Sequence, residues 1–199
     1  MLKKVAVTGG LSCGKSSVCR FFNELGATVI RADDIVHRQL SPDTDLGKKV
    51  IELLGEEIVV KGKIDRSRIA KKVFNHPGLL NSLEQLLHPI VYEEIDKEYN
   101  RAKSEDHSPL FVAEVPLLFE SDGEKYFDEV ISVIANADIC WTRFREETGY
   151  EREEYNRRMG RQLDPHKKSE QSDHIIENNG TVEELQIKVK NLFEDLKGK

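Results

Sequence analysis

The strongest constraint on the fold of this chain is a glycine-rich stretch near its start. Gly9 is followed by four residues and then by Gly14, Lys15 and Ser16, which is the spacing of a phosphate-binding loop. In such a loop the glycines let backbone N–H groups point at a phosphate, and the positive end of the following helix adds to their field. The pattern therefore predicts a strand, this loop and a helix in succession, with a nucleoside triphosphate as the ligand.

The residues before the loop are typical of a strand, and those after it are typical of a helix, as this prediction requires. An apolar, β-rich run over 4–8 precedes it, and apolar residues at helical spacing follow it until Gly26. Lys15 would reach the β- and γ-phosphates as a catalytic residue, and the Ser16 hydroxyl would join the shell of a Mg²⁺ ion. The expected cofactors are thus ATP and Mg²⁺. The residues expected to bind ATP in the loop are Ser12, Cys13, Gly14, Lys15, Ser16 and Ser17.

Four further segments have the pattern of buried strands, namely 27–30, 110–115, 130–135 and 173–177. Helical patterns separate them, and the last strand is followed by a helix with a capping sequence that starts at Thr181. Strands that alternate with helices indicate a parallel sheet with helices on both faces. The chain is thus expected to be α/β, with three layers and a five-stranded parallel sheet.

Two segments interrupt this core, which we place at about 1–34, 108–142 and 172–199. The pattern over 35–107 is helical, which predicts a helical insertion. In the segment 143–171 basic residues alternate with glutamates. That mixture is typical of a solvated helical face, and it also fits a lid that closes over a triphosphate.

Acidic residues follow two of the predicted strands, at the sheet edge where ligands collect. Asp33 and Asp34 come after the second strand, where a carboxylate could take the proton of an attacking hydroxyl group or cap the next helix. Capping by Asp34 and chemistry by Asp33 are compatible, and we favour a catalytic role. Glu114 ends the third strand, and it is either associated with magnesium or a solvated carboxylate.

Composition excludes several classes of protein. With 33% charged residues and a net charge of −6, the surface is not that of a general polyanion binder, so we expect no nucleic-acid partner. Apolar runs are too short for a signal peptide or a membrane span, which predicts a cytoplasmic protein without a membrane partner. Three cysteines without C-x-x-C spacing favour neither disulfides nor zinc. Cys13 is either a thiol activated by the loop's positive potential or a small residue that fits the turn.

Motifs along nearly the whole chain resemble those of the dephospho-coenzyme A kinase family. They are the phosphate loop preceded by Thr8, Ala32-Asp33, Asp65-Arg66 with Val73-Phe74, Leu83-Glu84 with Leu87-His88-Pro89, Val115-Pro116-Leu117-Leu118-Phe119-Glu120, Arg158-Met159 with Gln162, and Ile176-Glu177-Asn178-Asn179-Gly180. The ordered set is far more specific than the loop alone. That family transfers the γ-phosphoryl group of ATP to the ribose 3′-hydroxyl of dephospho-CoA, the last step of coenzyme A synthesis, in a fold similar to nucleoside monophosphate kinases.

The resemblance implies a single P-loop kinase chain with a helical acceptor-binding insertion and a helical lid, acting as a monomer on ATP and dephospho-CoA. Asp33 becomes the general base, Arg143 a catalytic arginine on the phosphates of ATP, and Asn178 a residue near the adenine. The substrate-binding residues that it implies are Thr8, Asp33, His88, Pro116, Leu117 and Phe119.

The chain departs from the family pattern at three places. It has Arg31-Ala32-Asp33 where the family usually has Asp-Ala-Asp, and Ser12-Cys13 where Gly-Ser is usual before the second glycine of the loop. Glu147 stands where members often have a second arginine, four residues past Arg143. The charge of the lid must then come from Arg145, Arg158 or Arg161.

Three other classes of protein share a phosphate loop. A GTPase would need an N-K-x-D motif, which the sequence lacks. A kinase for another small acceptor, such as a nucleoside monophosphate or shikimate, would differ mainly in the insertion and is the serious alternative. A nucleotide-binding module without catalysis is disfavoured by Asp33 together with a lid-like segment.

Overall fold

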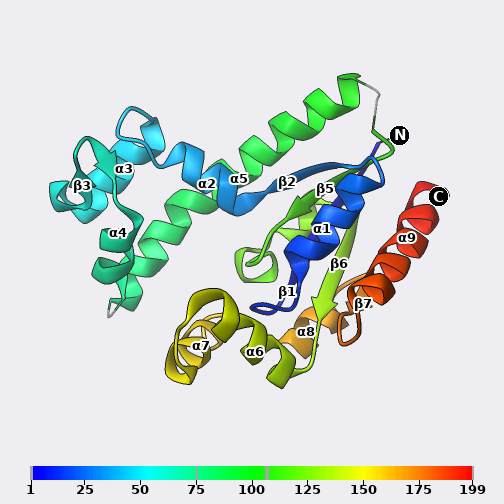
Figure 1. Ribbon diagram of the computed structural model, residues 1–199. Helices are drawn as coiled ribbons and strands as arrows, with labels where there is room; N and C mark the ends of the chain where they lie inside the picture. Colours follow the sequence, from blue (N-terminus) through cyan, green and yellow to red (C-terminus); the bar gives the residue numbers. More distant parts are fainter. Residues whose placement is uncertain (1, 75, 106–107, 199) are drawn as a thin grey trace. The chain divides into compact units, whose positions relative to one another are not determined.

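The computed structural model describes residues 2–74, 76–105 and 108–198 (Figure 1). Positions 1, 75, 106, 107 and 199, which fall within the predicted core and insertion, lie outside the described residues. The chain forms two compact units, one made of Met1–Arg31 with Glu98–Lys199 and the other of Ala32–Lys97. The first unit contains the phosphate loop.

A five-stranded parallel sheet lies at the centre of the first unit, and all five predicted strands are present. Their order is β2-β5-β1-β6-β7. The strands are β1 (Lys3–Gly9), β2 (Thr28–Arg31), β5 (Leu110–Glu114), β6 (Glu129–Ile134) and β7 (His174–Glu177). Because β1 lies between β5 and β6, the loop that follows it leaves the sheet where the strand order reverses, which is where ligands bind in such sheets.

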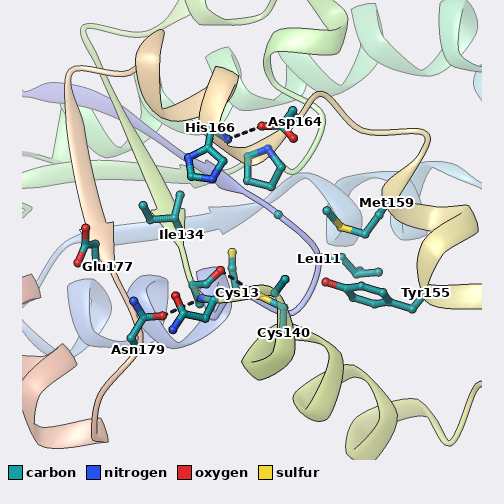
Figure 2. A pocket seen from close by; sticks show the side chains of 15 residues that line it. Leu11, Cys13, Ile134, Cys140, Tyr155, Met159, Asp164, His166, Glu177 and Asn179 are labelled. Carbon is teal, nitrogen blue, oxygen red and sulfur yellow. Dashed lines mark hydrogen bonds between the residues drawn. The ribbon is translucent and has the colours of Figure 1, made fainter. Parts of the chain in front are cut away.

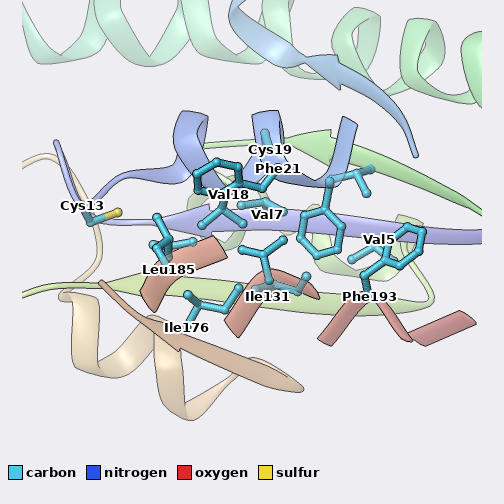
Figure 3. Packing of buried hydrophobic residues seen from close by; sticks show 14 of the residues in the cluster. Val5, Val7, Cys13, Val18, Cys19, Phe21, Ile131, Ile176, Leu185 and Phe193 are labelled. Carbon is cyan, nitrogen blue, oxygen red and sulfur yellow. The ribbon is translucent and has the colours of Figure 1, made fainter. Parts of the chain in front are cut away.

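Helices cover both faces of this sheet, which confirms the predicted three layers. On one face, α1 (Lys15–Glu24) and α9 (Val182–Gly198) bury apolar side chains against β1 and β6 (Figure 3). Phe22 of α1 and Phe193 of α9 meet with ring centroids 6.4 Å apart, above Val5 and Val7. Alternate residues of a strand face opposite sides, so Phe111 points to the other face, where Tyr99 packs edge-on at 5.4 Å.

The ends of two helices follow directly from the sequence. Gly14 precedes α1 in the left-handed conformation, with φ of 99°, which glycine adopts without strain. Thr181 Oγ1 accepts a hydrogen bond from the Glu184 backbone N–H at 3.3 Å, and Glu184 Oε2 accepts one from the Thr181 N–H at 3.1 Å. This reciprocal pair is the predicted cap of the last helix.

The remaining helices of the first unit follow β5 and β6. They are η2 (Phe119–Ser121), η3 (Glu124–Tyr126), α6 (Ala137–Thr148), α7 (Arg152–Met159) and α8 (Pro165–Glu170). Tyr99 belongs to the end of α5 (Pro77–Glu105), which runs on from the second unit. Within the segment 143–171, Phe144 and Tyr155 belong to the main core, and their ring centroids lie 5.3 Å apart. This segment is therefore not a uniformly solvated face.

The second unit is mainly helical and has its own core around Leu46, Val50, Leu54 and Leu83. Its other elements are α2 (Ala32–Gln39), α3 (Asp45–Leu54), η1 (Glu56–Ile58), β3 (Val59–Val60), β4 (Lys63–Ile64) and α4 (Arg66–Val73). The antiparallel pair β3-β4 was not predicted. The cap assigned to Asp34 is wrong, because α2 begins at Ala32 and thus contains Asp34 in its first turn.

Candidate nucleotide site

The phosphate loop takes a backbone path that two of its glycines make possible. Gly9 has φ of 142° and Gly14 has φ of 99°, both in a region that L side chains rarely adopt. A Cβ atom at Gly9 would lie 2.1 Å from the Val133 carbonyl oxygen, and one at Gly14 would lie 2.1 Å from Asn178 Nδ2. Both glycines are therefore required by conformation, Gly9 also by the close approach of β6 and Gly14 by that of the Asn178 side chain.

Lys15, the predicted catalytic lysine, begins α1 and is buried within the curve of the loop. Its Nζ atom donates to the carbonyl oxygen of Gly10 at 2.7 Å and to that of Gly9 at 3.3 Å. The loop thus holds an ammonium group beside the backbone that is expected to bind phosphate. A phosphate that entered the loop would offer this ammonium a charged acceptor in place of two neutral carbonyls.

Ser16, Glu114 and Arg31 form a closed triangle of hydrogen bonds at the ends of β2 and β5. Ser16 Oγ donates to Glu114 Oε1 at 3.0 Å, and Arg31 Nε donates to Glu114 Oε2 at 3.0 Å. Arg31 Nη2 also lies 3.4 Å from Ser16 Oγ. Because Glu114 is only 5% exposed, its interpretation as a solvated carboxylate is wrong.

Ser16 and Glu114 supply the kind of ligands that Mg²⁺ accepts. One hydroxyl and one carboxylate suffice for this ion when phosphates and water complete its shell. Within residues 2–74, 76–105 and 108–198, no cluster of three or more His, Cys, Asp or Glu side chains could hold a metal on its own. Ser16 and Glu114 fit a magnesium ion as two oxygen ligands of its shell.

Arg143 and Asn178, both predicted to contact ATP, meet at the loop. Asn178 is 6% exposed, and its Nδ2 donates to the Cys13 carbonyl oxygen at 2.9 Å. Arg143 Nη2 donates to the Asn178 carbonyl oxygen at 3.2 Å, whereas Arg143 Nη1 is buried and has no acceptor among the described residues. A buried donor without an acceptor costs free energy, which an anionic ligand beside Gly14 would recover.

A lysine of the segment 143–171 holds the turn after β5 that contains the predicted substrate-binding residues Pro116, Leu117 and Phe119. Lys168 Nζ donates to the Pro116 carbonyl oxygen at 2.8 Å and pairs with Glu120 Oε1 at 2.9 Å. Thr8 Oγ1 donates to the same carbonyl at 3.3 Å. Burial lowers the pKa of Lys168, and the bond to Glu120 opposes that shift. Nothing in the sequence distinguishes the buried Lys168 from the adjacent, exposed Lys167.

The other predicted residues of this turn differ in accessibility. Leu117 is half-buried, and Phe119 is 9% exposed, so Leu117 offers more surface to a ligand than Phe119 does.

A cavity of about 480 Å³ opens beside the loop, between it and the helices α6 and α7 (Figure 2). Its lining is largely apolar and includes Leu11, Cys13, Ile134, Cys140, Tyr155 and Met159. Cys13 is only 1% exposed and belongs to the core, which favours its interpretation as a small residue that fits the turn. Burial raises the pKa of Cys140 to about 11.

Two of the arginines in the segment 143–171 are held by a carboxylate on the same helix. Glu154 accepts hydrogen bonds from Arg157 at 2.7 and 2.6 Å and from Arg158 at 2.7 Å. These bonds, those of Arg157 first, lower the pKa of Glu154 to about 2. Arg158 also lies over the rings of Phe144 and Tyr150, at 5.5 and 5.2 Å from their centroids. Arg145 is exposed.

Asp33 and His88 belong to the second unit. Asp33 is exposed in the first turn of α2, two residues after the end of β2. His88 is half-buried in α5, next to Pro89 inside that helix. Their roles as general base and substrate-binding residue stay predictions.

The fold and the loop together define a P-loop nucleotide-binding protein, since a lysine and a serine follow the second glycine at the start of a helix that leaves the edge of a parallel sheet. The sequence model of the dephospho-CoA kinase family matches residues 3–184, and the chain belongs to this family.

Individual relatives agree with this membership. The chain is 48% identical to the dephospho-CoA kinase of Protochlamydia amoebophila over 197 residues, 98% of this chain and 97% of that protein. It is 47% identical to the dephospho-CoA kinase of Chlamydia pneumoniae over 99% of this chain and 98% of that protein. The solved structure of the dephospho-CoA kinase from Campylobacter jejuni is 25% identical and superposes with a TM-score of 0.73 over 100% of this chain and 98% of that one. In the part of the chain that the structure describes, no helix has the length and apolarity to cross a membrane.

Proposed function

We propose that this protein phosphorylates the ribose 3′-hydroxyl of dephospho-CoA with ATP and releases coenzyme A and ADP. The observation that carries the proposal is a complete phosphate loop in a chain that belongs to the dephospho-CoA kinase family over nearly its whole length. The alternative is a P-loop kinase for another small acceptor, such as a nucleoside monophosphate, because such kinases share the loop.

The loop binds the β- and γ-phosphates of ATP through its backbone N–H groups. Lys15 exchanges the carbonyls of Gly9 and Gly10 for phosphate oxygens, and Arg143 directs its unsatisfied Nη1 at the nucleotide. Asn178 donates a hydrogen bond to the Cys13 carbonyl oxygen of the loop. In this proposal it also binds ATP near the adenine. Ser16 and Glu114, which share a hydrogen bond, would hold Mg²⁺, and the ion would neutralise charge on the phosphates.

Asp33 accepts the proton of the ribose 3′-hydroxyl while that oxygen attacks the γ-phosphorus. The bond from the γ-phosphorus to the bridging oxygen breaks, and ADP leaves with the electron pair. The substrate-binding residues in this proposal are Thr8, Pro116, Leu117, Phe119 and His88.

In this proposal the insertion at about 35–107 binds the acceptor, and the segment at about 143–171 closes over ATP and excludes water. The protein acts as a cytoplasmic monomer on small molecules and has no nucleic-acid partner.

The test is ADP release with dephospho-CoA, AMP, CMP and shikimate as acceptors. We expect kcat/KM for dephospho-CoA to exceed that for AMP by at least about 10²-fold, roughly 2.7 kcal/mol, because contacts beyond the adenosine contribute. Mass spectrometry of the product should show one added phosphoryl group, and a folded Lys15→Ala variant should give no product. Comparable rates with AMP, or none with dephospho-CoA, would overturn the proposal.

A further inference from the structure

Arg31 brings a permanent positive charge to the two side chains that fit a magnesium ion. It ends β2 directly opposite Glu114 of β5, and its guanidinium lies 3.0 Å from Glu114 Oε2 and 3.4 Å from Ser16 Oγ. The guanidinium therefore contacts both of the oxygen-bearing groups that are available to a divalent cation here.

The two partners of this pair differ in their access to water. The Glu114 side chain is 6% exposed, whereas the Arg31 side chain is 45% exposed. A buried carboxylate is costly without a cation beside it, so Glu114 needs a positive partner at all times. The Arg31 side chain can therefore be solvated by water in a way that the Glu114 carboxylate cannot.

A divalent ion would compete with Arg31 for these oxygens. Mg²⁺ binds oxygen ligands at about 2.1 Å and requires near-octahedral geometry, so an ion on Ser16 and Glu114 would lie within a few ångströms of the guanidinium. Two cations at that separation repel each other, and they would share the single negative charge of Glu114 although its two oxygens differ in partner. The metal therefore binds more weakly unless Arg31 moves away.

We propose that Arg31 and the metal of a metal–nucleotide complex alternate on Ser16 and Glu114. In the metal-free protein Arg31 compensates the buried carboxylate, and with metal-free nucleotide it supplies a cation beside the phosphates. When metal–nucleotide binds, Arg31 leaves Glu114. This inference rests on the proposed function in one respect, namely that a metal–nucleotide complex binds at the phosphate loop.

The proposal predicts that one substitution has opposite effects on two quantities, the affinity for metal-free nucleotide and the gain in affinity that the metal provides. Loss of the charge at Arg31 should weaken the binding of metal-free nucleotide, because a cation beside the phosphates is gone. The same loss should strengthen the effect of the metal, because nothing must then be displaced from Glu114. A residue that only stabilised the fold would change both affinities in the same direction.

The experiment measures ADP binding by calorimetry, so that no turnover occurs, first with a chelator and then over a range of Mg²⁺ concentrations. Arg31→Met keeps much of the side-chain length without its charge. The matched control is Arg20→Met, which removes one exposed arginine that pairs with Glu24 on α1. We expect Arg31→Met to weaken metal-free ADP at least about fivefold and to increase the gain in affinity from Mg²⁺ at least about tenfold, with the control unchanged.

Arg31→Met leaves Glu114 buried without a cation and could unfold, so Arg31→Lys provides a second measurement. Its compact ammonium lacks the fork that spans both oxygens, and we expect an intermediate gain from Mg²⁺. If Mg²⁺ increases the ADP affinity of the wild-type protein and of both variants equally, within about twofold, the proposed role of Arg31 is overturned. The proposed function would not be affected by that result. Failure of the wild-type protein to bind ADP with Mg²⁺ present would instead overturn the proposed function, and this inference with it.

Discussion

The ammonium group of Lys168 lies 2.9 Å from a carboxylate oxygen of Glu120, and the two side chains differ sharply in their access to solvent. Lys168 is 0% exposed, whereas the Glu120 side chain is 18% exposed. The same ammonium donates to Pro116, and Glu120 accepts the backbone N–H of Leu163 at 2.7 Å. The pair thus joins α8 and the chain before it to the turn that follows β5.

We predict that removal of the carboxylate costs more stability than removal of the ammonium. Glu120→Ala leaves Lys168 buried and charged without its counter-ion, and should lower the free energy of unfolding by about 3 kcal/mol or more. Lys168→Met should cost less, because Glu120 keeps Leu163 and can reach water. Urea unfolding measures the free energy of unfolding of both variants. Lys167→Met, at an exposed position, is the control. A larger loss for Lys168→Met than for Glu120→Ala would contradict this account.

The sheet and the loop could be predicted because their signals are local. Each strand is a short apolar run, and the phosphate loop is defined by residues that lie next to one another in the chain. The β3-β4 pair was missed because strands of two residues are too short to show an alternating pattern. The wrong cap at Asp34 has a similar cause, because α2 follows β2 without the turn that a cap would occupy.

Burial of charged residues was the least predictable feature of the site. Glu114 is buried because Ser16 and Arg31, 98 and 83 residues away in sequence, satisfy its two oxygens. Lys168 is buried because a carbonyl oxygen 52 residues away accepts a hydrogen bond from its ammonium group. These partners lie far from Glu114 and Lys168 in the sequence, so the residues next to them give no indication of the contacts. The local pattern therefore predicts a solvated charge at each position.

Substitution of Gly14 separates backbone strain from steric conflict in the loop. Gly14 and Gly26 have similar φ values of 99° and 94°, so alanine at either position pays about 1–2 kcal/mol of strain. A Cβ at Gly14 would also collide with Asn178, whereas at Gly26 it meets no described atom within 4 Å. Gly14→Ala should therefore lose nucleotide binding and should lower the free energy of unfolding more than Gly26→Ala does. Gly26→Ala should bind the nucleotide normally. Calorimetric titration with ADP distinguishes them, and equal losses would argue against the Asn178 contact.

All three thiols should be unreactive in the folded protein. Cys13, Cys19 and Cys140 are 1%, 2% and 5% exposed, and burial raises the pKa of Cys19 as well as that of Cys140. Reaction requires an accessible thiolate. We expect a chromogenic disulfide reagent at about pH 8 to label none of them within minutes, and to label all three in denaturant. Rapid loss of one thiol, absent in Cys13→Ser, would instead support an activated Cys13.

Acid should weaken α7 through Glu154. Its pKa is lowered from 4.5 to about 2 in the folded protein, so its contribution to stability is present above about pH 4.5 and is lost as the pH falls through about 2. Because these ion pairs are partly exposed, we expect that contribution to be about 1 kcal/mol at most. Urea unfolding of Glu154→Gln should show a deficit at neutral pH that shrinks in acid. The exposed Glu153→Gln is the control, and a deficit independent of pH would exclude this role.

Asp33 and its neighbour Asp34 give the sharpest test of the proposed chemistry. Both are exposed carboxylates in the first turn of α2, so the electrostatic effect of either on that helix should be similar. Asparagine at position 33 keeps the size and hydrogen-bonding capacity of the side chain but cannot accept the proton of the acceptor hydroxyl group. We therefore expect Asp33→Asn to lower kcat by about 10²-fold or more, with the affinity for ATP little changed, whereas Asp34→Asn should stay near the wild-type rate. Steady-state kinetics with dephospho-CoA and direct binding of ATP provide the two measurements. If Asp33→Asn keeps its rate at saturation but binds ATP poorly, then Asp33 is a binding residue, and the general base must be sought elsewhere.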